Sequence, residues 1–109
     1  MRSIAFAVGQ VARYRRGHFL TLHDDFAEGK HRLAAYVPGL TLDWGADCGG
    51  QLQFLDRHGE VEDVFIPGFN VLSVFKVPSL HLVTTVAPHV SHPRLSITGW
   101  LRTRSESSG

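Results

Sequence analysis

The chain has 109 residues, of which 43% are hydrophobic, and a formal net charge of +1 with its seven histidines neutral. This length predicts a single domain, 1–109, and the hydrophobic fraction excludes a disordered chain. The basic residues are scattered, which excludes the concentrated positive surface of a nucleic-acid-binding protein. No apolar run approaches the roughly 20 residues that cross a bilayer. The lone Cys48 excludes an internal disulfide and indicates a reducing, cytoplasmic location.

Short runs of β-branched and aromatic residues alternate with turn residues, a pattern typical of all-β proteins. Residues 1–13 form a partial lead-in, and their apolar start is the end of a packed helix or a first strand. The expected strands then cover residues 17–23, 31–37, 51–55, 61–66, 71–77, 82–86 and 94–102. Residues 56–59 form a hairpin loop, and the polar residues 103–109 form a disordered tail. Because no stretch has a strong helical period, the sequence predicts an all-β jelly-roll barrel with little or no helical buttress.

The stretch FLTLHDDF, residues 19–26, places an imidazole and two carboxylates at the end of a strand. Residues at i and i+2 share one face of a strand, so His23 and Asp25 point the same way as Thr21. Asp24 points to the opposite side. With one more histidine, His23 and Asp25 would form the two-histidine, one-carboxylate site of non-haem iron. The motif alone equally fits a polar cap at the surface.

A second histidine and an arginine lie in the last third of the chain. His81 directly precedes the strongly β-forming run LVTTV, whereas His89 and His92 lie among prolines in a loop. Further on, RLSITGW alternates cleanly, and one of its faces carries Arg94, Ser96, Thr98 and Trp100. That face either meets solvent or lines a polar cavity. In a cavity, the Arg94 guanidinium would bind a carboxylate through two parallel hydrogen bonds.

The ordered motifs HDD, GGQLQF, HLVTTV and RLSITGW resemble the iron(II)- and 2-oxoglutarate-dependent dioxygenases over residues 14–102. The resemblance is strongest to their prolyl-hydroxylase-like branch, and it implies a double-stranded β-helix. It implies three ligands for Fe(II): His23, Asp25 and His81. It implies four contacts to 2-oxoglutarate: Arg94, Tyr14, Thr98 and Tyr36. It also implies L-ascorbate as a further cofactor.

The activity that this resemblance implies is hydroxylation of an unactivated C–H bond, with release of succinate and CO2. The implied partners are O2, 2-oxoglutarate and a peptide or protein carrying a prolyl-type side chain. The register near Tyr36 leaves a choice, because the contact to 2-oxoglutarate is absent if Val37 faces inward instead. Two other functions stay open: a catalytically inactive or truncated cupin-like module that binds a metal or ligand, and a β-sandwich interaction domain.

Two departures from the family pattern bear on these expectations. Pro38-Gly39 stands where relatives often have Leu-Asn, so the turn there differs. Only residues 1–13 precede Tyr14, whereas the family usually adds helices and strands that cover the barrel. We therefore expect either a truncated product or a minimal barrel whose exposed sheet is covered by a partner or a second copy.

Overall fold

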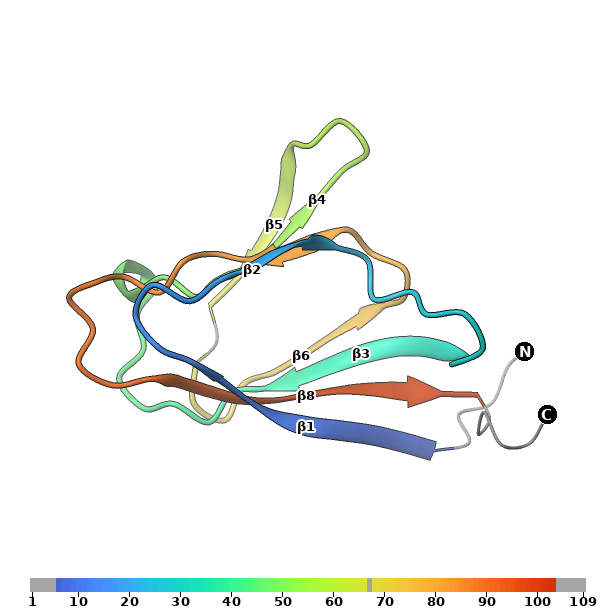
Figure 1. The fold of residues 1–109 in the computed structure, drawn as a ribbon, viewed down its shortest axis with the longest axis horizontal. Coiled ribbons are helices and arrows are strands. Elements are labelled where there is room, and N and C mark those ends of the chain that lie inside the picture. The colour runs from blue at the N-terminus through green and yellow to red at the C-terminus, as the bar shows by residue number, and fades with distance from the viewer. Residues whose placement is uncertain (1–5, 67, 104–109) are drawn as a thin grey trace.

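Residues 6–66 and 68–103 are described in the computed structural model, which contains two four-stranded antiparallel sheets (Figure 1). One sheet has the strand order β1 (Phe6–Tyr14), β8 (Arg94–Arg102), β3 (Arg32–Pro38), β6 (Leu72–Lys76). The other has the order β2 (Leu20–His23), β7 (His81–Val83), β4 (Leu52–Leu55), β5 (Val61–Phe65). Helical structure in the described ranges is limited to the short 3₁₀ turn η1 (Ala46–Cys48). The predicted all-β jelly roll without a helical buttress is confirmed.

The first strand was not among the seven that the sequence predicted with defined bounds. β1 pairs with β8 along its whole length, from Phe6 opposite Arg102 to Tyr14 opposite Arg94. From Phe6 on, the apolar first segment is therefore a strand rather than the end of a helix, and it extends through Tyr14. The sequence left both a helix end and a first strand open for this segment, because the small residues of FAVGQVARY carry little β propensity.

Two strands differ most from their predicted bounds. The segment 17–23 becomes β2 only from Leu20, and 82–86 is shifted to His81–Val83. β7 ends there because the Gln51 amide donates to the Thr84 side-chain hydroxyl (2.9 Å) instead of to a backbone carbonyl. Sequence periodicity carries no information about such a side-chain substitution in the ladder.

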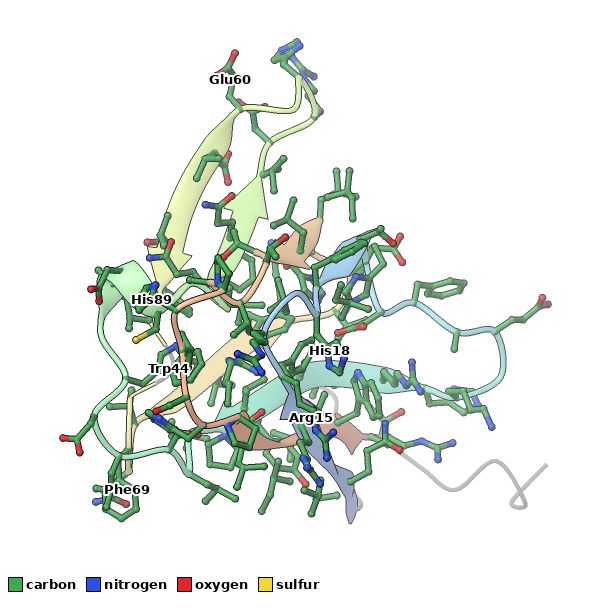
Figure 2. The ribbon with its side chains drawn as sticks, turned by 60° about the vertical axis from the view of Figure 1, so that its left-hand side comes forward. Arg15, His18, Trp44, Glu60, Phe69 and His89 are labelled. Carbon is green, nitrogen blue, oxygen red and sulfur yellow. The ribbon has the colours of Figure 1, made fainter. Side chains whose placement is uncertain are left out.

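The predicted hairpin loop at 56–59 joins β4 and β5. The Asp56 carboxylate accepts the amide hydrogens of His58 (2.8 Å) and Glu60 (3.0 Å), which fixes the turn. Figure 1 shows this hairpin projecting away from the sheet that contains β8, and Figure 2 shows Glu60 at its outer end. The inner surface of β5 is therefore open at this side of the barrel.

The buried core is small, as expected for a chain of this length. Trp44, Val86 and Val90 form one buried cluster beside the sheets. Val11 is 71% exposed and Leu72 60% exposed on the sheet that contains β8. A partner or a second copy covering that sheet stays a prediction. Within residues 6–66 and 68–103, no helix has the length and apolar character that a membrane crossing needs.

Both ends of the chain extend beyond the described residues. The predicted disordered tail, 103–109, lies outside the described residues except for Thr103, whose amide donates to the His31 carbonyl (3.0 Å). The first part of the predicted lead-in, 1–5, also lies outside them.

Candidate functional site

His23, Asp25 and His81 converge at one end of the space between the two sheets. His23 ends β2 and His81 begins β7, and the two residues are direct partners across the antiparallel pair. Their imidazole centroids lie 4.1 Å apart. The Asp25 carboxylate reaches both rings, with Oδ1 3.0 Å from Nε2 of His23 and Oδ2 3.3 Å from Nε2 of His81. The structure therefore brings the three expected metal ligands together.

The convergence arises from a different backbone feature than strict strand alternation. β2 carries one extra residue relative to β7, because Leu20 pairs with Val83 while His23 pairs with His81. This bulge turns Leu20, rather than Thr21, into the same cavity as His23. Asp25 lies beyond the strand with φ of 65°, a left-handed conformation that returns its carboxylate toward the rings. The expectation that Thr21 shares the face of His23 is therefore wrong.

The hydrogen bonds of the two imidazoles leave their Nε2 atoms facing the carboxylate. Nδ1 of His23 bonds to the Thr21 carbonyl (2.7 Å) and Nδ1 of His81 to the Ser79 carbonyl (2.6 Å). A carbonyl only accepts, so each Nδ1 carries a hydrogen and each neutral ring presents a lone pair at Nε2. Lone pairs and carboxylate oxygens at about 3 Å repel unless a proton or a metal cation lies among them. This donor set fits a divalent metal.

The pKa shifts at the site follow from this geometry. Burial raises the pKa of Asp25, but the hydrogen bond and charge of His81 and the charge of His23 lower it more, so the net pKa lies below its usual value. Burial lowers the pKa of His81, but the hydrogen bonds to Asp25 and Ser79 raise it above its usual 6.5. The Trp100 indole N–H also favours the Asp25 carboxylate, although its Nε1 makes no hydrogen bond among the described residues.

Arg94 lines the same cavity, which encloses about 330 Å³ and also contains the three metal-ligand candidates. Its side chain is 2% exposed. Nη1 donates to the Ser96 hydroxyl (3.3 Å), Nε has no hydrogen-bond partner, and no carboxylate in the described ranges forms an ion pair with it. A buried charge without an opposite charge costs several kcal/mol. The pocket therefore fits an anion, and a guanidinium fork fits a carboxylate.

Glycine and tyrosine residues set the position of Arg94. A Cβ on Gly50, whose φ is 61°, would lie 2.9 Å from the Arg94 Cδ. Gly50 thus makes room for Arg94, whereas a Cβ on Gly49 would clash with the Thr85 carbonyl oxygen. Tyr14 is the register partner of Arg94 on β1, and the guanidinium lies 5.0 Å from its ring centroid. Burial lowers the pKa of Arg94, and burial also raises the pKa of Tyr14, so the phenol stays protonated at neutral pH.

The remaining two expected 2-oxoglutarate contacts differ in their placement. Thr98 lines the cavity together with Arg94. Tyr36 lies on the opposite face of its sheet, because a Cβ on Gly9 would meet its hydroxyl at 2.8 Å, and Val37 lines the cavity instead. Val37 rather than Tyr36 therefore faces the cavity, and Tyr36 is not placed to make the expected contact to 2-oxoglutarate.

Two polar residues of the cavity were not singled out as site residues by the sequence. Gln10 lines it from β1, the strand whose bounds were not predicted. Trp100 lines it from β8 with a buried indole N–H. The alternation that placed Trp100 on the face of Arg94 was the available signal for it, whereas Gln10 had none without the pairing of β1.

Comparison with known proteins adds to this geometry. The family model described as the 2OG-Fe(II) oxygenase superfamily matches residues 9–102. A search of curated protein sequences finds no significant match.

Solved structures with a similar fold include three oxygenases. A Pseudomonas putida prolyl-4-hydroxylase is 28% identical with a TM-score of 0.79, over 93% of this chain and 54% of that one. A Trichoplax adhaerens prolyl hydroxylase, in complex with a hypoxia inducible factor peptide fragment, is 25% identical with a TM-score of 0.81, over 98% and 49%. A Burkholderia pseudomallei 2OG-Fe(II) oxygenase shares the fold at 22% identity and a TM-score of 0.74, over 89% and 42%. The chain thus spans about half the length of these proteins.

Proposed function

The chain belongs to the 2OG-Fe(II) oxygenase superfamily, and on that premise we propose that it is an Fe(II)- and 2-oxoglutarate-dependent dioxygenase that hydroxylates a C–H bond. One observation carries the proposal. A two-histidine, one-carboxylate cluster and a buried arginine that has no anionic partner among the described residues line the same cavity. The cluster is a site for a metal cation and the arginine is a site for a carboxylate. Fe(II) and the dicarboxylate 2-oxoglutarate, the two groups in the family name, have these properties.

In this proposal His23, Asp25 and His81 hold Fe(II), and Arg94 binds the distal carboxylate of 2-oxoglutarate. When bound, the two groups supply oxidative decarboxylation of 2-oxoglutarate by O2 to succinate and CO2, coupled to insertion of oxygen into a substrate C–H bond. The backbone carbonyls that accept from the two histidines orient the imidazoles and fix their tautomer.

Residues around these groups bind, orient and exclude water. Tyr14, protonated and facing Arg94, is a hydrogen-bond donor for an anion held there, and Thr98 adds a hydroxyl from the same face. The apolar wall includes Leu20, Leu52 and Val83. Such a wall lowers the local dielectric, which strengthens the attraction between Arg94 and a carboxylate.

We further propose a peptidyl, prolyl-type side chain as the substrate. The support is the likeness to two solved prolyl hydroxylases, one of them in complex with a peptide fragment. The involvement of L-ascorbate stays a prediction of the resemblance.

The experiment that tests the activity needs no substrate. The protein is mixed anaerobically with Fe(II) and 2-oxoglutarate, O2 is admitted, and succinate is measured over time. We expect succinate that depends on both Fe(II) and 2-oxoglutarate. Fe(II) binding without succinate at any O2 level would instead indicate a metal-binding module, and the absence of both would indicate an interaction domain.

A further inference from the structure

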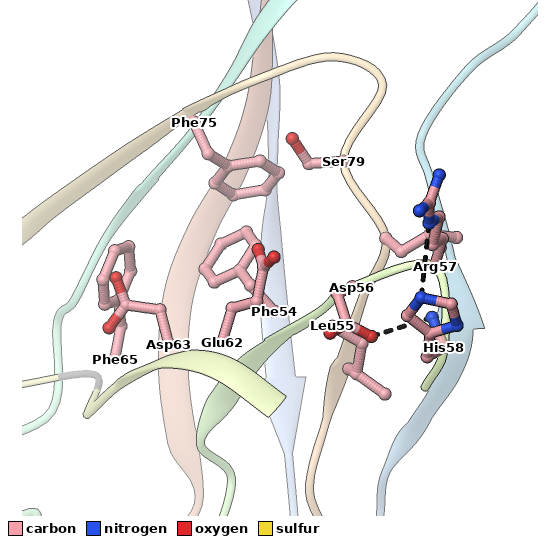
Figure 3. A pocket seen from close by; sticks show the side chains of 11 residues that line it. Phe54, Leu55, Asp56, Arg57, His58, Glu62, Asp63, Phe65, Phe75 and Ser79 are labelled. Atoms are coloured by element: carbon pink, nitrogen blue, oxygen red, sulfur yellow. Dashed lines mark hydrogen bonds between the residues drawn. The ribbon is translucent and has the colours of Figure 1, made fainter. Parts of the chain in front are cut away.

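A second hollow opens beside the metal cavity, on the inner side of the projecting β4–β5 hairpin. It encloses about 730 Å³, and Phe54, Phe65 and Phe75 form its floor (Figure 3). Phe75 lines this groove and the metal cavity alike. The groove therefore adjoins the candidate site at Phe75.

A chain of aromatic contacts connects the groove to the metal ligands. The ring centroids of Phe65 and Phe54 lie 5.1 Å apart, and those of Phe54 and Phe75 lie 4.9 Å apart. Phe75 in turn lies 4.8 Å from the His81 ring, which lies 4.1 Å from the His23 ring. A chain segment that reaches the metal from this side would lie across these phenyl faces.

Strand register places a carboxylate in the same row as the metal ligands. His23 pairs with His81, His81 pairs with Phe54, and Phe54 pairs with Asp63. Cross-strand partners present their side chains to the same face of a sheet. Asp63 is therefore the outer member of a row that runs from the metal ligands to the open edge strand β5.

A bulge adds a second carboxylate to this face. Phe54 pairs with Asp63 but Leu55 pairs with Val61, so Glu62 is the extra residue on β5. Glu62 and Asp63 both line the groove, although neighbours on a regular strand would point to opposite faces. Both are exposed, and neither forms an ion pair with a described residue. Figure 3 shows them on the side of Phe54 and Phe65.

The remaining charges of the groove leave this side acidic. Asp56 uses its carboxylate in the hairpin turn. Arg57 lies with His58 on the other side of the groove in Figure 3, and its Nε donates to the His58 ring (3.3 Å). Two carboxylates above phenyl faces thus have no cation from the described chain. Carboxylates and aromatic faces together are the chemistry that binds an ammonium or guanidinium group.

We propose that this groove binds a lysine or arginine of the peptide substrate, held between Glu62, Asp63 and the phenyl floor. The proposal rests on the proposed function for the peptide that reaches the metal, and it adds the charge class of that peptide. A basic side chain fits because the groove offers two carboxylates that form no ion pair with a described residue, beside phenyl rings that a cation can contact.

The distance between the strands also predicts how far the basic residue lies from the hydroxylated residue along the peptide. Asp63 is two strands from His81, which corresponds to about 10 Å at the usual strand separation. An extended peptide covers about 10 Å in three residues. The basic residue therefore lies about three positions from the residue that is hydroxylated, with one more or fewer allowed by side-chain length.

The test compares binding of two pairs of fluorescently labelled peptides to the full chain. Every peptide has a central proline, and the two members of a pair differ only in lysine or glutamine three positions away. This residue precedes the proline in one pair and follows it in the other. Fluorescence anisotropy is measured anaerobically with Fe(II) and 2-oxoglutarate, and again without metal. We expect about three- to tenfold tighter binding of one lysine peptide, because two exposed charge contacts and a phenyl face contribute modestly.

Variants then assign the preference to the groove. Glu62→Gln with Asp63→Asn should abolish the preference for lysine, and Glu62→Lys with Asp63→Lys should reverse it toward a glutamate peptide. Glu60→Gln removes a carboxylate from the same hairpin outside the groove lining, so it should keep the preference. Succinate formation without peptide should stay unchanged in all three proteins.

The outcomes separate this inference from the proposed function. Equal affinity for the lysine and glutamine peptides, or an equal loss in Glu60→Gln, would overturn the groove proposal even if the protein forms succinate. Absence of succinate together with an intact, metal-independent lysine preference would overturn the oxygenase proposal and leave the groove as a site for basic peptides.

Discussion

His23, Asp25 and His81 approach the cavity from one sheet, whereas Arg94 and Tyr14 approach it from the other. At the first end, the carboxylate lies between two imidazoles that can carry protons, so its charge is balanced within the protein. At the second end, a buried guanidinium has no anion among the described residues. The metal end is therefore stable without its ligand, while the arginine end lowers the stability of the empty protein.

The difference teaches which side chains act independently. Because the two groups of residues lie on different sheets, a change at the arginine end should leave metal binding intact. The Arg94 prediction below tests that independence, the other predictions test one end each, and the expected effects decrease from the first to the last.

The largest effect is expected from His81→Ala. It removes one of three metal ligands, and even loss of a residue that only orients a ligand costs 10- to 100-fold in metal affinity. We expect Fe(II) or Co(II) affinity, measured by titration, to fall more than about 100-fold. His58→Ala removes an exposed histidine of the β4–β5 hairpin and should change the affinity less than twofold. Full metal affinity in His81→Ala would refute the proposed metal site.

Arg94→Met should separate the two ends. Loss of the guanidinium should weaken 2-oxoglutarate binding about 30- to 100-fold, because a charge-paired hydrogen bond in a buried site is lost. Metal affinity should stay within twofold, and the free energy of unfolding without ligands should rise by about 1 kcal/mol, since an unbalanced buried charge is removed. Calorimetric titration and urea unfolding measure these quantities. Arg13→Met, on the exposed face of β1, should change neither.

The pH dependence of metal binding should follow His81. Metal binding needs a neutral imidazole, and the pKa of His81 lies above its usual 6.5. Asp25, with its lowered pKa, stays ionised near neutral pH, so it does not contribute to the pH dependence of metal affinity there. Affinity for Co(II) should therefore rise by at least about tenfold per pH unit below the His81 pKa, because both imidazole ligands must be neutral, and level off at higher pH. A flat profile between pH 6 and about 7 would contradict the assignment of His81.

The smallest effect concerns the two tyrosines. Tyr14→Phe removes a protonated hydroxyl beside Arg94 and should weaken 2-oxoglutarate binding about threefold, the typical net value of one hydrogen bond. Tyr36→Phe alters the opposite face of the sheet and should leave that binding unchanged. Equal losses in the two variants would show that the effect of Tyr14 is not specific to the anion pocket.

The placement of the metal ligands illustrates what local pattern can predict. The order of H-x-D, a distal histidine and an arginine on an alternating strand resembles a known family, and that resemblance selected His23, Asp25, His81 and Arg94. The structure then places all four around one cavity. Periodicity could not predict the bulge in β2 or the left-handed Asp25, because both depend on how β2 pairs with β7.

Other features depended on contacts between distant segments. Tyr36 and Val37 differ by one position, and only the register of β3 against β8 decides which one faces the cavity. The extra residue at Glu62 likewise appears only when β5 is paired with β4. A shift of one residue exchanges the two faces of a strand, so short-range pattern alone leaves such choices open.

The fold class, seven of the eight strands, and the residue types of a metal and an anion site could be read from the amino-acid pattern, because two-residue periodicity and turn residues act locally. Three properties became visible only in the folded chain: the two sites share one cavity, Arg94 is buried without an anion among the described residues, and an acidic aromatic groove adjoins the metal site. Those properties arise from pairing and burial between segments far apart in the chain, which no local pattern contains.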